Sequence, residues 1–361
     1  MSGDNPTPIE TSSPVASVIR RGPRPRRITA SLHFEDRLWQ VATRVAVTVP
    51  LLGLVFVIII LAVKAWPAIK VNGPGYLTSS VWQVGNFYGA VQHTHGVAHP
   101  EGAVYGAWPL IAGTLESSLI AIIIAVPVSI GTAFALTERM PKWIAQPLGF
   151  FVEILAGIPS VVIGLWGVLV LGPFLAQHVY PLVANHVPNV PVLRYFRGSV
   201  GYGEGLLTSG LVLSFMIVPI IASTTRDLFL QVPVLPKEGA EALGFTDAEV
   251  ARRVTLPWVR SGIVGATMLG LGRAIGETIA IAMVSGSVLG TVAPNIYGTM
   301  TTIAATIVSQ LDSSLTDGTG FALSNLAEAG LLLALISIAV NLAARTIVRH
   351  TGKLMAPVGR G

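Results

Sequence analysis

A positive and a negative side chain lie four residues apart inside a long apolar stretch of this chain. They are Arg273 and Glu277, within the run Gly270-Leu271-Gly272-Arg273-Ala274-Ile275-Gly276-Glu277-Thr278. On a continuous helix, residues four apart share a face, so each charge would partly neutralise the other. A guanidinium donates paired hydrogen bonds to oxyanions such as phosphate and keeps its charge when desolvated. These residue types therefore point to anion binding within a membrane.

Two interpretations of this pair stay open. A full charge in mid-membrane costs at least about 2.5–3.5 kcal/mol on insertion scales, so the pair needs a purpose. In one interpretation Arg273 contacts an anion on a path through the membrane, while Glu277 holds the guanidinium in place. In the other, the two form a structural ion pair that locks helix packing, with the glycines allowing a neighbouring helix to approach closely. The Gly270-x-Gly272 spacing is not a dinucleotide loop, because no strand precedes it.

A second motif is a polar segment between two long apolar ones. It begins Glu238-Gly239-Ala240-Glu241-Ala242-Leu243-Gly244, then runs for nine residues to Val254-Thr255-Leu256-Pro257. Pro236 suits the first turn of a helix, and Gly244 can adopt the left-handed conformation that ends one. Thr246 and Glu249 have the spacing of a capping box, which predicts a second helix closed by Leu256-Pro257. The segment therefore predicts a compact two-helix knob for docking a partner, in which Leu243 and Phe245 insert and Glu238 and Glu241 offer charge.

Apolar runs predict about six transmembrane helices. The chain has 361 residues, of which 52% are hydrophobic and 11% charged, whereas about 25% charged is usual for a globular chain. Each run is near or above the about 20 residues that cross a bilayer as a helix, and continuous rather than alternating runs argue against strands. The predicted spans are 45–63, 110–136, 150–175, 206–223, 262–289 and 322–344. The third is interrupted by Gly157, Pro159 and Gly164, which predicts a break or kink.

The distribution of basic residues predicts the orientation. Of the 23 Lys and Arg residues, 18 fall before the first span, after the sixth, or in the connections that share their side. Under the positive-inside rule both termini and the docking segment are cytoplasmic. The net charge of +5 is then a topology signal with lipid headgroups as partner, rather than a sign of nucleic-acid binding.

The two motifs resemble those of a known family. The spacing from Glu238 to Pro257 resembles the coupling loop of ABC importer permeases, which fits a groove on the ATPase subunit. The run from Arg273 to Thr278 resembles the fifth-span motif of the phosphate-specific importer permeases. So do Glu153-Ile154-Leu155-Ala156-Gly157-Ile158-Pro159-Ser160-Val161-Val162 and the stretch from Gly113 to Pro127. The long first loop favours the PstC-type subunit, and the resemblance covers about residues 45–347.

The resemblance implies a type I ABC importer permease fold in a bacterial plasma membrane. It implies import of inorganic phosphate by one half of a permease heterodimer, with two ATPase subunits and an extracytoplasmic phosphate-binding protein as partners. Transport residues would be Arg273 and Glu277, and we place Thr278 and Arg226 on the same substrate path. The coupling residues would be Glu238, Gly239, Ala240, Leu243, Gly244, Phe245, Val254, Leu256 and Pro257. Gly239 departs from the broader pattern, which has Ala there. Alternatives are a permease for another oxyanion, such as sulfate or molybdate, and a non-transporting scaffold for an ATPase.

The predicted organisation has five parts. Residues 1–40 form a disordered basic tail, 41–65 the first anchor and 66–109 an extracytoplasmic loop. Residues 110–347 form the permease core with the coupling loop at 226–260, and residues 348–361 form a cytoplasmic tail. The 66–109 loop contains His93, His95 and His99, which we interpret as a solvated set rather than a metal site, since no carboxylate or cysteine completes a shell.

Several charged residues have open roles. Arg226, at the inner end of the fourth span, either contacts phosphate or anchors in lipid headgroups. Glu153 either faces the path or caps the helix break near Pro159. Glu328 would pair with a polar neighbour, and Glu116 is left without a role.

Some functions are excluded by what the chain lacks. The sequence has no cysteine, no G-x-x-x-x-G-K-(S/T) phosphate loop and no convincing nucleophile–base pair. We therefore expect no catalytic residues, no cofactor and no metal, and a transport function that uses ATP would depend on partner chains for its hydrolysis.

Overall fold

The computed structural model describes residues 30–188 and 190–353, which are mainly helical. Within these residues, six helices are long and apolar enough to cross a membrane. They are Arg37–Leu77, Trp108–Arg139, Ser160–His186, Leu206–Leu230, Asp247–Ile275 and Phe321–Thr346. The predicted all-α membrane architecture with about six spans is confirmed.

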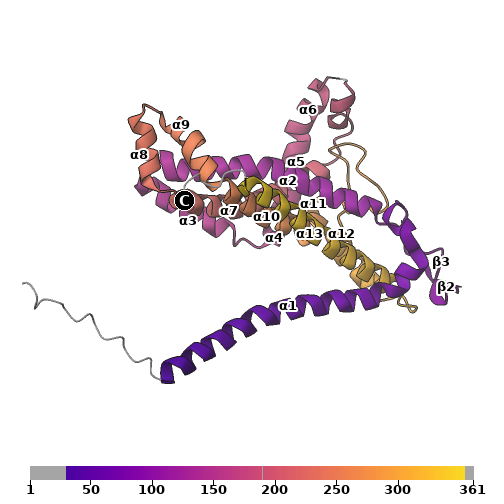
Figure 1. The fold of residues 1–361 in the computed structure, drawn as a ribbon. Coiled ribbons are helices and arrows are strands. Elements are labelled where there is room, and N and C mark those ends of the chain that lie inside the picture. The colour runs from indigo at the N-terminus through magenta and orange to yellow at the C-terminus, as the bar shows by residue number, and fades with distance from the viewer. Residues whose placement is uncertain (1–29, 189, 354–361) are drawn as a thin grey trace, which may run out of the picture. The chain divides into compact units, whose positions relative to one another are not determined.

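Figure 1 shows the elements along the chain. The α-helices are α1 (Ala30–Asn72), α2 (Trp108–Phe134), α3 (Lys142–Leu155), α4 (Ser160–Trp166), α5 (Gly172–Phe174), α6 (Tyr180–His186), α7 (Leu206–Leu230), α8 (Val234–Ala242), α9 (Asp247–Val250), α10 (Leu256–Ile275), α11 (Ile279–Val284), α12 (Ile303–Ser314) and α13 (Phe321–Lys353). Short 3₁₀ turns are η2 (Gly73–Leu77) and η6 (Pro191–Phe196), and π-helical turns are η3 (Ala135–Arg139), η4 (Gly167–Leu171), η5 (Leu175–Val179) and η7 (Ala251–Thr255). The strands are β1 (Trp82–Gln83), β2 (Asn86–Thr94), β3 (Val97–Glu101) and β4 (Val104–Tyr105).

The chain divides into two units, Met1–Phe56 and Val57–Gly361. The described part of the first unit is the beginning of α1, which starts at Ala30. Residues 30–40, predicted as part of a disordered tail, are therefore helical, while residues 1–29 lie outside the described residues. The large apolar side chains of this first unit, from Leu38 to Phe56, are exposed. A continuous apolar surface of this kind needs a cover other than water, and a bilayer supplies one.

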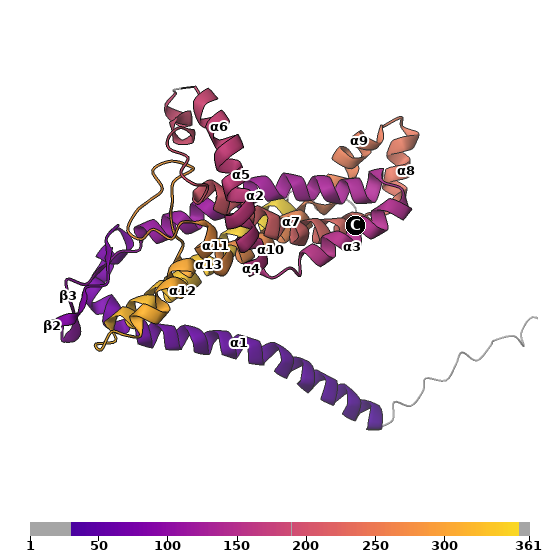
Figure 2. The ribbon, with the colours of Figure 1, turned by 180° about the vertical axis from the view of Figure 1, so that it is seen from behind.

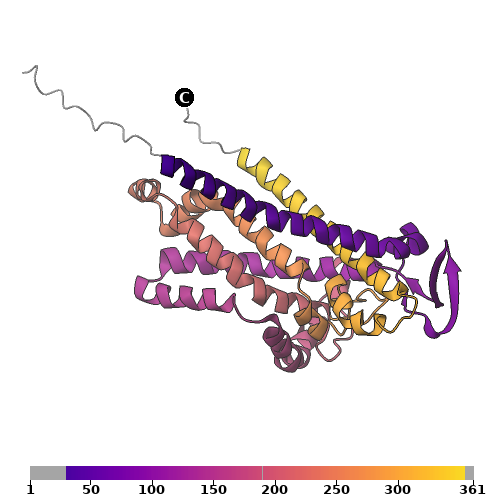
Figure 3. The same cartoon turned by 90° about the horizontal axis from the view of Figure 1, so that it is seen from below.

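The second unit is built around α7, the most deeply buried of the spans. Its inward side chains, among them Val212, Leu213, Ile217 and Ile221, form a core with small residues of α2. Small side chains let two helices approach closely where lipid supplies no hydrophobic drive for their association. Figure 3 shows α2 and α7 running alongside one another. The Ser129 hydroxyl on α2 donates to the Val218 carbonyl on α7 at 3.1 Å, which adds a polar tie between them.

We expect Gly113→Ala to destabilise the protein. A Cβ at Gly113 would lie 2.1 Å from the Thr301 carbonyl oxygen, which is backbone and must shift to make room. Overpacking of this kind typically costs about 1–3 kcal/mol, so the apparent melting temperature in detergent should fall by several degrees. Gly131→Ala is the matched control, because it lies on the same helix with nothing within 4 Å of its Cβ. Equal melting of the two variants would contradict the predicted clash.

The segment 66–109 is more ordered than a loop. Its first residues complete α1, and its remainder includes two antiparallel two-stranded sheets, β1–β4 and β2–β3. His95 and Gly96 both have positive φ, at 50° and 76°, as a tight two-residue hairpin turn requires. The prediction of a loop missed these strands because they are short and irregular, with a register shift between Asn86 and Val91. The rings of Trp82 and Tyr105 pack edge-on with their centroids 5.0 Å apart. Both belong to the same buried cluster as Phe321, so the strands pack against the start of α13.

Helices α8 and α9, which form the predicted two-helix knob, lie at the opposite end of the long helices of the second unit from the strands. Figures 1 and 2 both show α8 and α9 at one end and β2 and β3 at the other. This arrangement matters for function, because a membrane around the spans would separate the two ends.

The boundaries of the third and fifth predicted spans were wrong, and so was the start of the C-terminal tail. The third span breaks at Ala156–Pro159 as predicted, but it is α3 that ends there, and the spanning helix is Ser160–His186 rather than 150–175. The fifth ends at Ile275 instead of continuing to residue 289. Helix α13 continues to Lys353, so residues 348–353 are helical rather than tail, and residues 354–361 lie outside the described residues. Apolar composition continues across each break, and composition alone does not mark a helix end.

Candidate functional site

The predicted two-helix knob is present, and we define it as residues 234–250. Gly244 has φ of +85°, the left-handed conformation predicted for it, and its N–H donates to the Glu241 carbonyl at 2.9 Å. The Thr246 hydroxyl accepts from the Glu249 N–H at 3.4 Å, and the Glu249 carboxylate accepts from the Thr246 N–H at 3.0 Å. The predicted capping box is therefore confirmed.

The predicted end of the second knob helix was wrong. Leu256 and Pro257 do not close it, because the π-helical turn η7 carries the chain from α9 directly into α10. The Leu256 N–H reaches the Ala251 carbonyl five residues back. Such a wide turn is common at functional sites, and it places Pro257 in the first turn of α10, where its missing N–H costs little.

The predicted coupling residues divide by exposure. Glu238, Gly239, Leu243 and Gly244 are exposed, with 79% of Leu243 open. The others support the knob from within or at its base: Ala240 is buried, and Phe245, Val254, Leu256 and Pro257 are half-buried. Phe245 lies beneath the Arg253 guanidinium at 5.1 Å. The knob therefore presents an apolar tip beside acidic side chains.

Arg273 and Glu277 do not pair as the sequence suggested. Helix α10 ends at Ile275, so Glu277 lies in the break before α11 rather than one turn along the same helix. The described part of the chain contains no ion pair between them. Arg273 is exposed, and Glu277 is half-buried. The Thr278 hydroxyl donates to the Gly276 carbonyl at 3.1 Å and stabilises the break.

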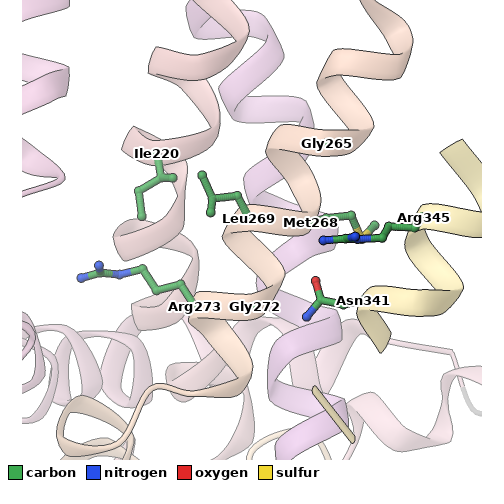
Figure 4. Close-up of a pocket in the computed structure, with 8 residues that line it drawn as sticks. All are labelled: Ile220, Gly265, Met268, Leu269, Gly272, Arg273, Asn341 and Arg345. Atoms are coloured by element: carbon green, nitrogen blue, oxygen red, sulfur yellow. The ribbon is translucent and has the colours of Figure 1, made fainter. Parts of the chain in front are cut away.

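Arg273 lines a wide hollow of about 850 Å³ on the surface of the second unit. Its lining comes from three helices: Ile220 of α7, Gly265, Met268, Leu269, Gly272 and Arg273 of α10, and Asn341 and Arg345 of α13. Figure 4 shows Arg345 reaching from α13 towards α10, whereas the Arg273 side chain leaves α10 on the side away from α13. The described lining contains two arginines and no carboxylate. The lining is therefore positive, but the two guanidinium groups lie on different sides of α10 and do not form one clamp around an anion (Figure 4).

The sequence reasoning missed Asn341 and Arg345. It placed Arg345 just outside the sixth span, among the residues that set the topology. A usable signal was present, because residues four apart on a helix share a face and these two are the polar residues at the end of that span.

Arg226 is not assembled with Arg273. Its guanidinium donates to the Glu153 carboxylate at 2.8 Å and joins α7 to α3. A Cβ at Gly149 would lie 2.7 Å from Arg226 Nη1, so the missing side chain at Gly149 makes room for the guanidinium. We had expected Arg226 to contact phosphate or lipid headgroups, and Glu153 to face the path or cap a helix break. None of these expectations included an ion pair between the two residues. The pair is between residues far apart in sequence, so no local pattern predicted it.

The comparisons with known proteins agree with this geometry. The family model described as binding-protein-dependent transport system inner membrane component matches residues 125–356. The phosphate transport system permease protein PstC 1 of Mycobacterium tuberculosis is 59% identical over 88% of this chain and 94% of its own. The chain belongs to the PstC family of permeases. The Haemophilus influenzae PstC is 39% identical to it over 81% of this chain and 86% of its own.

A solved structure supports the fold of this PstC-family chain. The crystal structure of a bacterial ABC transporter involved in the import of the acidic polysaccharide alginate contains a chain with a TM-score of 0.51 and 16% identity. It covers 87% of this chain and 99% of that chain. At this identity the likeness concerns the fold alone, and it confirms the predicted type I ABC importer permease fold. The PstC-family chain is a multi-pass membrane protein and a transport component.

Glu328 of the PstC-family chain has the polar neighbour that the sequence reasoning expected. Glu328 is 7% exposed, and its carboxyl accepts from the Asn72 side-chain amide at 2.8 Å. The same amide also donates to the side-chain oxygen Oδ1 of Asn325 at 2.5 Å. Asn72 ends α1, whereas Asn325 and Glu328 belong to α13. This network therefore ties the end of α1 to the sixth span.

We expect Asn72→Ala to lower the stability of the PstC-family chain. The change removes the donor to a buried carboxyl, and an unsatisfied buried polar group costs about 1–3 kcal/mol, more if charged. The apparent melting temperature in detergent should fall by several degrees. Asn341→Ala is the control, because the Asn341 side chain is exposed and its amide donates to the Ser337 carbonyl of its own helix rather than to a buried carboxyl. An unchanged melt for Asn72→Ala would show that the network contributes little.

Two further polar groups of the PstC-family chain find partners. The Tyr195 hydroxyl donates to the Glu116 carboxylate at 3.2 Å, and burial, aided by that carboxylate, raises the pKa of Tyr195 to about 12, so the phenol keeps its proton.

His99 is buried rather than solvated, which corrects the expectation for it, and its Nε2 lies 2.8 Å from the Thr94 hydroxyl. His93 and His95 are exposed. Within the described residues, no three His, Cys, Asp or Glu side chains gather as a metal site would require.

Proposed function

We propose that this PstC-family chain is the permease subunit of an ATP-driven importer of inorganic phosphate and that it forms half of the translocation path. One observation carries the substrate: the 59% identity, over 94% of its length, to a protein named as a phosphate transport system permease. The positive hollow is consistent with it, since an arginine fork matches the oxygens of a phosphate.

Arg273 is the proposed phosphate contact. Its guanidinium is exposed and without an ion pair in the described part of the chain, so its hydrogen-bond donors remain available to an anion. Glu277 and Thr278 lie in the break at the end of α10 and would shape the path beside it. Arg226 is a weaker candidate, because its guanidinium is engaged by Glu153.

The proposed partners are a second homologous permease subunit, two ATPase subunits and an extracytoplasmic phosphate-binding protein. The knob would dock the ATPase from the cytoplasm, and the binding protein would approach at the end of the helices that carries β2 and β3. The placement of these two features at opposite ends of the helices is consistent with partners on opposite sides of the membrane (Figures 1 and 2). The excess of Lys and Arg would put both termini and the knob on the cytoplasmic side. The hydrolysis of ATP belongs to the partner chains.

Alternating access is the proposed mechanism. ATP-driven closure of the ATPase dimer would draw the knobs of the two permeases together and open the cavity outwards. The binding protein would deliver phosphate, and hydrolysis would reset the cavity inwards past Arg273. ATP can drive the closure only if it binds the closed ATPase dimer more tightly than the open one, because a ligand shifts a two-state equilibrium by its difference in affinity for the two states.

Reconstitution tests the proposal. The chain is placed in proteoliposomes with its partner permease, ATPase and phosphate-binding protein, and ATP-dependent uptake of labelled phosphate is measured with and without excess sulfate or molybdate. We expect phosphate uptake that unlabelled phosphate blocks and the other two anions do not. Uptake of sulfate or molybdate in place of phosphate would favour the other-oxyanion permease. An assembled complex that hydrolyses ATP without moving any anion would favour the scaffold.

A further inference from the structure

A half-buried ion pair joins the knob to the inner end of the second span. Lys237 on α8 places its Nζ 2.5 Å from Oε1 of Glu138 on η3, the last turn of the span Trp108–Arg139. The side chains are 18% and 23% exposed, respectively. The two residues are 99 positions apart in the sequence. The contact is therefore a tertiary one, and it ties α8 to a span that does not adjoin it along the chain.

The position of the pair gives it mechanical consequences. Helix α8 follows α7 after the short connection Gln231–Pro233, and it also packs on α9 and η7. Through these contacts α8 is joined to the fourth span, which is α7, and to the fifth span, which begins with α9. Glu138 instead lies just before the turn into α3, so the pair adds the hairpin of α2 and α3 to the elements that the knob touches. At its far end α3 is tied to α7 by Glu153 and Arg226.

We propose that Lys237 and Glu138 are positioning residues that make the α2–α3 hairpin follow the knob when the ATPase moves it. The inference rests on the proposed function, since it assumes that the knob docks an ATPase. Removing one partner of a close, largely desolvated charge pair leaves the other charge without compensation, so the contact resists separation. Without it, α8 can tilt about Gln231–Pro233 and leave the hairpin behind.

A neighbouring pair provides the matched control. Arg139, the residue after Glu138, contacts Asp247 of α9 and so also joins η3 to the knob. Its Nη1 lies 3.6 Å from Asp247 Oδ2, and the two side chains are 53% and 67% exposed. Exposed pairs of this kind contribute little. Neutralising this second pair should therefore leave coupling unchanged.

The first test measures phosphate transported per ATP hydrolysed in the complete reconstituted complex. We expect Glu138→Gln and Lys237→Gln each to lower this ratio by about fivefold or more, within the usual range of coupling between sites. ATPase copurification should persist, which a merely unfolded chain would not allow. The charge-swapped double variant E138K/K237E should recover the ratio, and Arg139→Gln, which removes the exposed pair from its end outside the knob, should keep it. Single variants with the original ratio would overturn the proposal, whereas an unsubstituted complex that moves no phosphate would instead contradict the proposed function.

A second test uses the absence of cysteine from the chain. The double variant E138C/K237C loses the ion pair and should show the lowered ratio. Joining the two thiols with a short bis-maleimide that contains a cleavable disulfide should restore phosphate transport per ATP, and reductive cleavage should lower it again. If the cross-link leaves the ratio low or blocks transport, α8 and the end of α2 must separate during the cycle, and the proposal is wrong.

Discussion

Replacing Arg273 with alanine is expected to lower ATP-dependent phosphate uptake by about 100-fold, because hydrogen bonds to charged groups contribute about 1.5–3 kcal/mol and a factor of 100 corresponds to about 2.8 kcal/mol. The physical reason is local. Arg273 is exposed in a hollow whose described lining contains no carboxylate, and it has no ion pair in the described part of the chain. Removing it takes away donors for an anion without leaving a buried charge unpaired, so the complex should still assemble.

The hollow supplies a control for this prediction. Arg345 lines the same hollow from α13 but points elsewhere than Arg273 (Figure 4). Arg345→Gln should therefore lower uptake far less than Arg273→Ala. Arg273→Lys should fall between them, since lysine keeps the charge but loses the planar fork. Uptake is measured in proteoliposomes with matched amounts of assembled complex. Full uptake by Arg273→Ala would remove Arg273 from the proposed path.

Gly244→Val should separate the permease from its ATPase on copurification, with the recovered ATPase falling about tenfold. Gly244 has φ of +85°, a conformation that costs an L-residue roughly 1–2 kcal/mol and is least tolerated by β-branched side chains. Relief of that strain would turn the exposed Leu243 and the neighbouring Phe245 away from the surface that the knob presents. Because 1.4 kcal/mol is a factor of ten in affinity, a modest strain is sufficient.

Gly239→Ala is the control for Gly244→Val. Gly239 lies inside α8 with ordinary helical geometry and nothing within 4 Å of its Cβ. Alanine there gains helix propensity of up to about 1 kcal/mol, and alanine is also the residue that the broader importer pattern has at this position. The variant should copurify its ATPase as the original chain does. If Gly244→Val also does so, the shape of the turn is not what the ATPase recognises.

Features that depend on local chemistry could be predicted from the sequence. The knob is the clearest case: a glycine that ends one helix and a Thr-x-x-Glu box that begins the next act over four residues, and both are present as predicted. The break before Pro159 was predictable for the same reason, since proline and glycine act on their immediate neighbours. The number of spans also followed, because each must bury a long apolar run in lipid.

Features that depend on tertiary contact could not be predicted. Arg273 and Glu277 have a helical spacing, but α10 ends between them, and the apolar run continues across that end without a marker. Arg226 pairs with Glu153, and Lys237 pairs with Glu138, although the partners are 73 and 99 residues apart in the sequence. Once a fold brings two charges together, their pairing follows from Coulomb attraction in a partly desolvated setting. Which charges meet is a property of the packed chain.

The continuity of η7 with α10 makes the fifth span a lever that joins the knob to Arg273. From Leu256 to Arg273, a rise of about 1.5 Å per residue gives an arm of roughly 25 Å. A rotation of about 10° at its base would therefore swing Arg273 through about 4 Å, more than the length of a hydrogen bond. A small angular change at the knob end, where we propose that the ATPase docks, is thus large enough to make or release a hydrogen bond to an anion at Arg273.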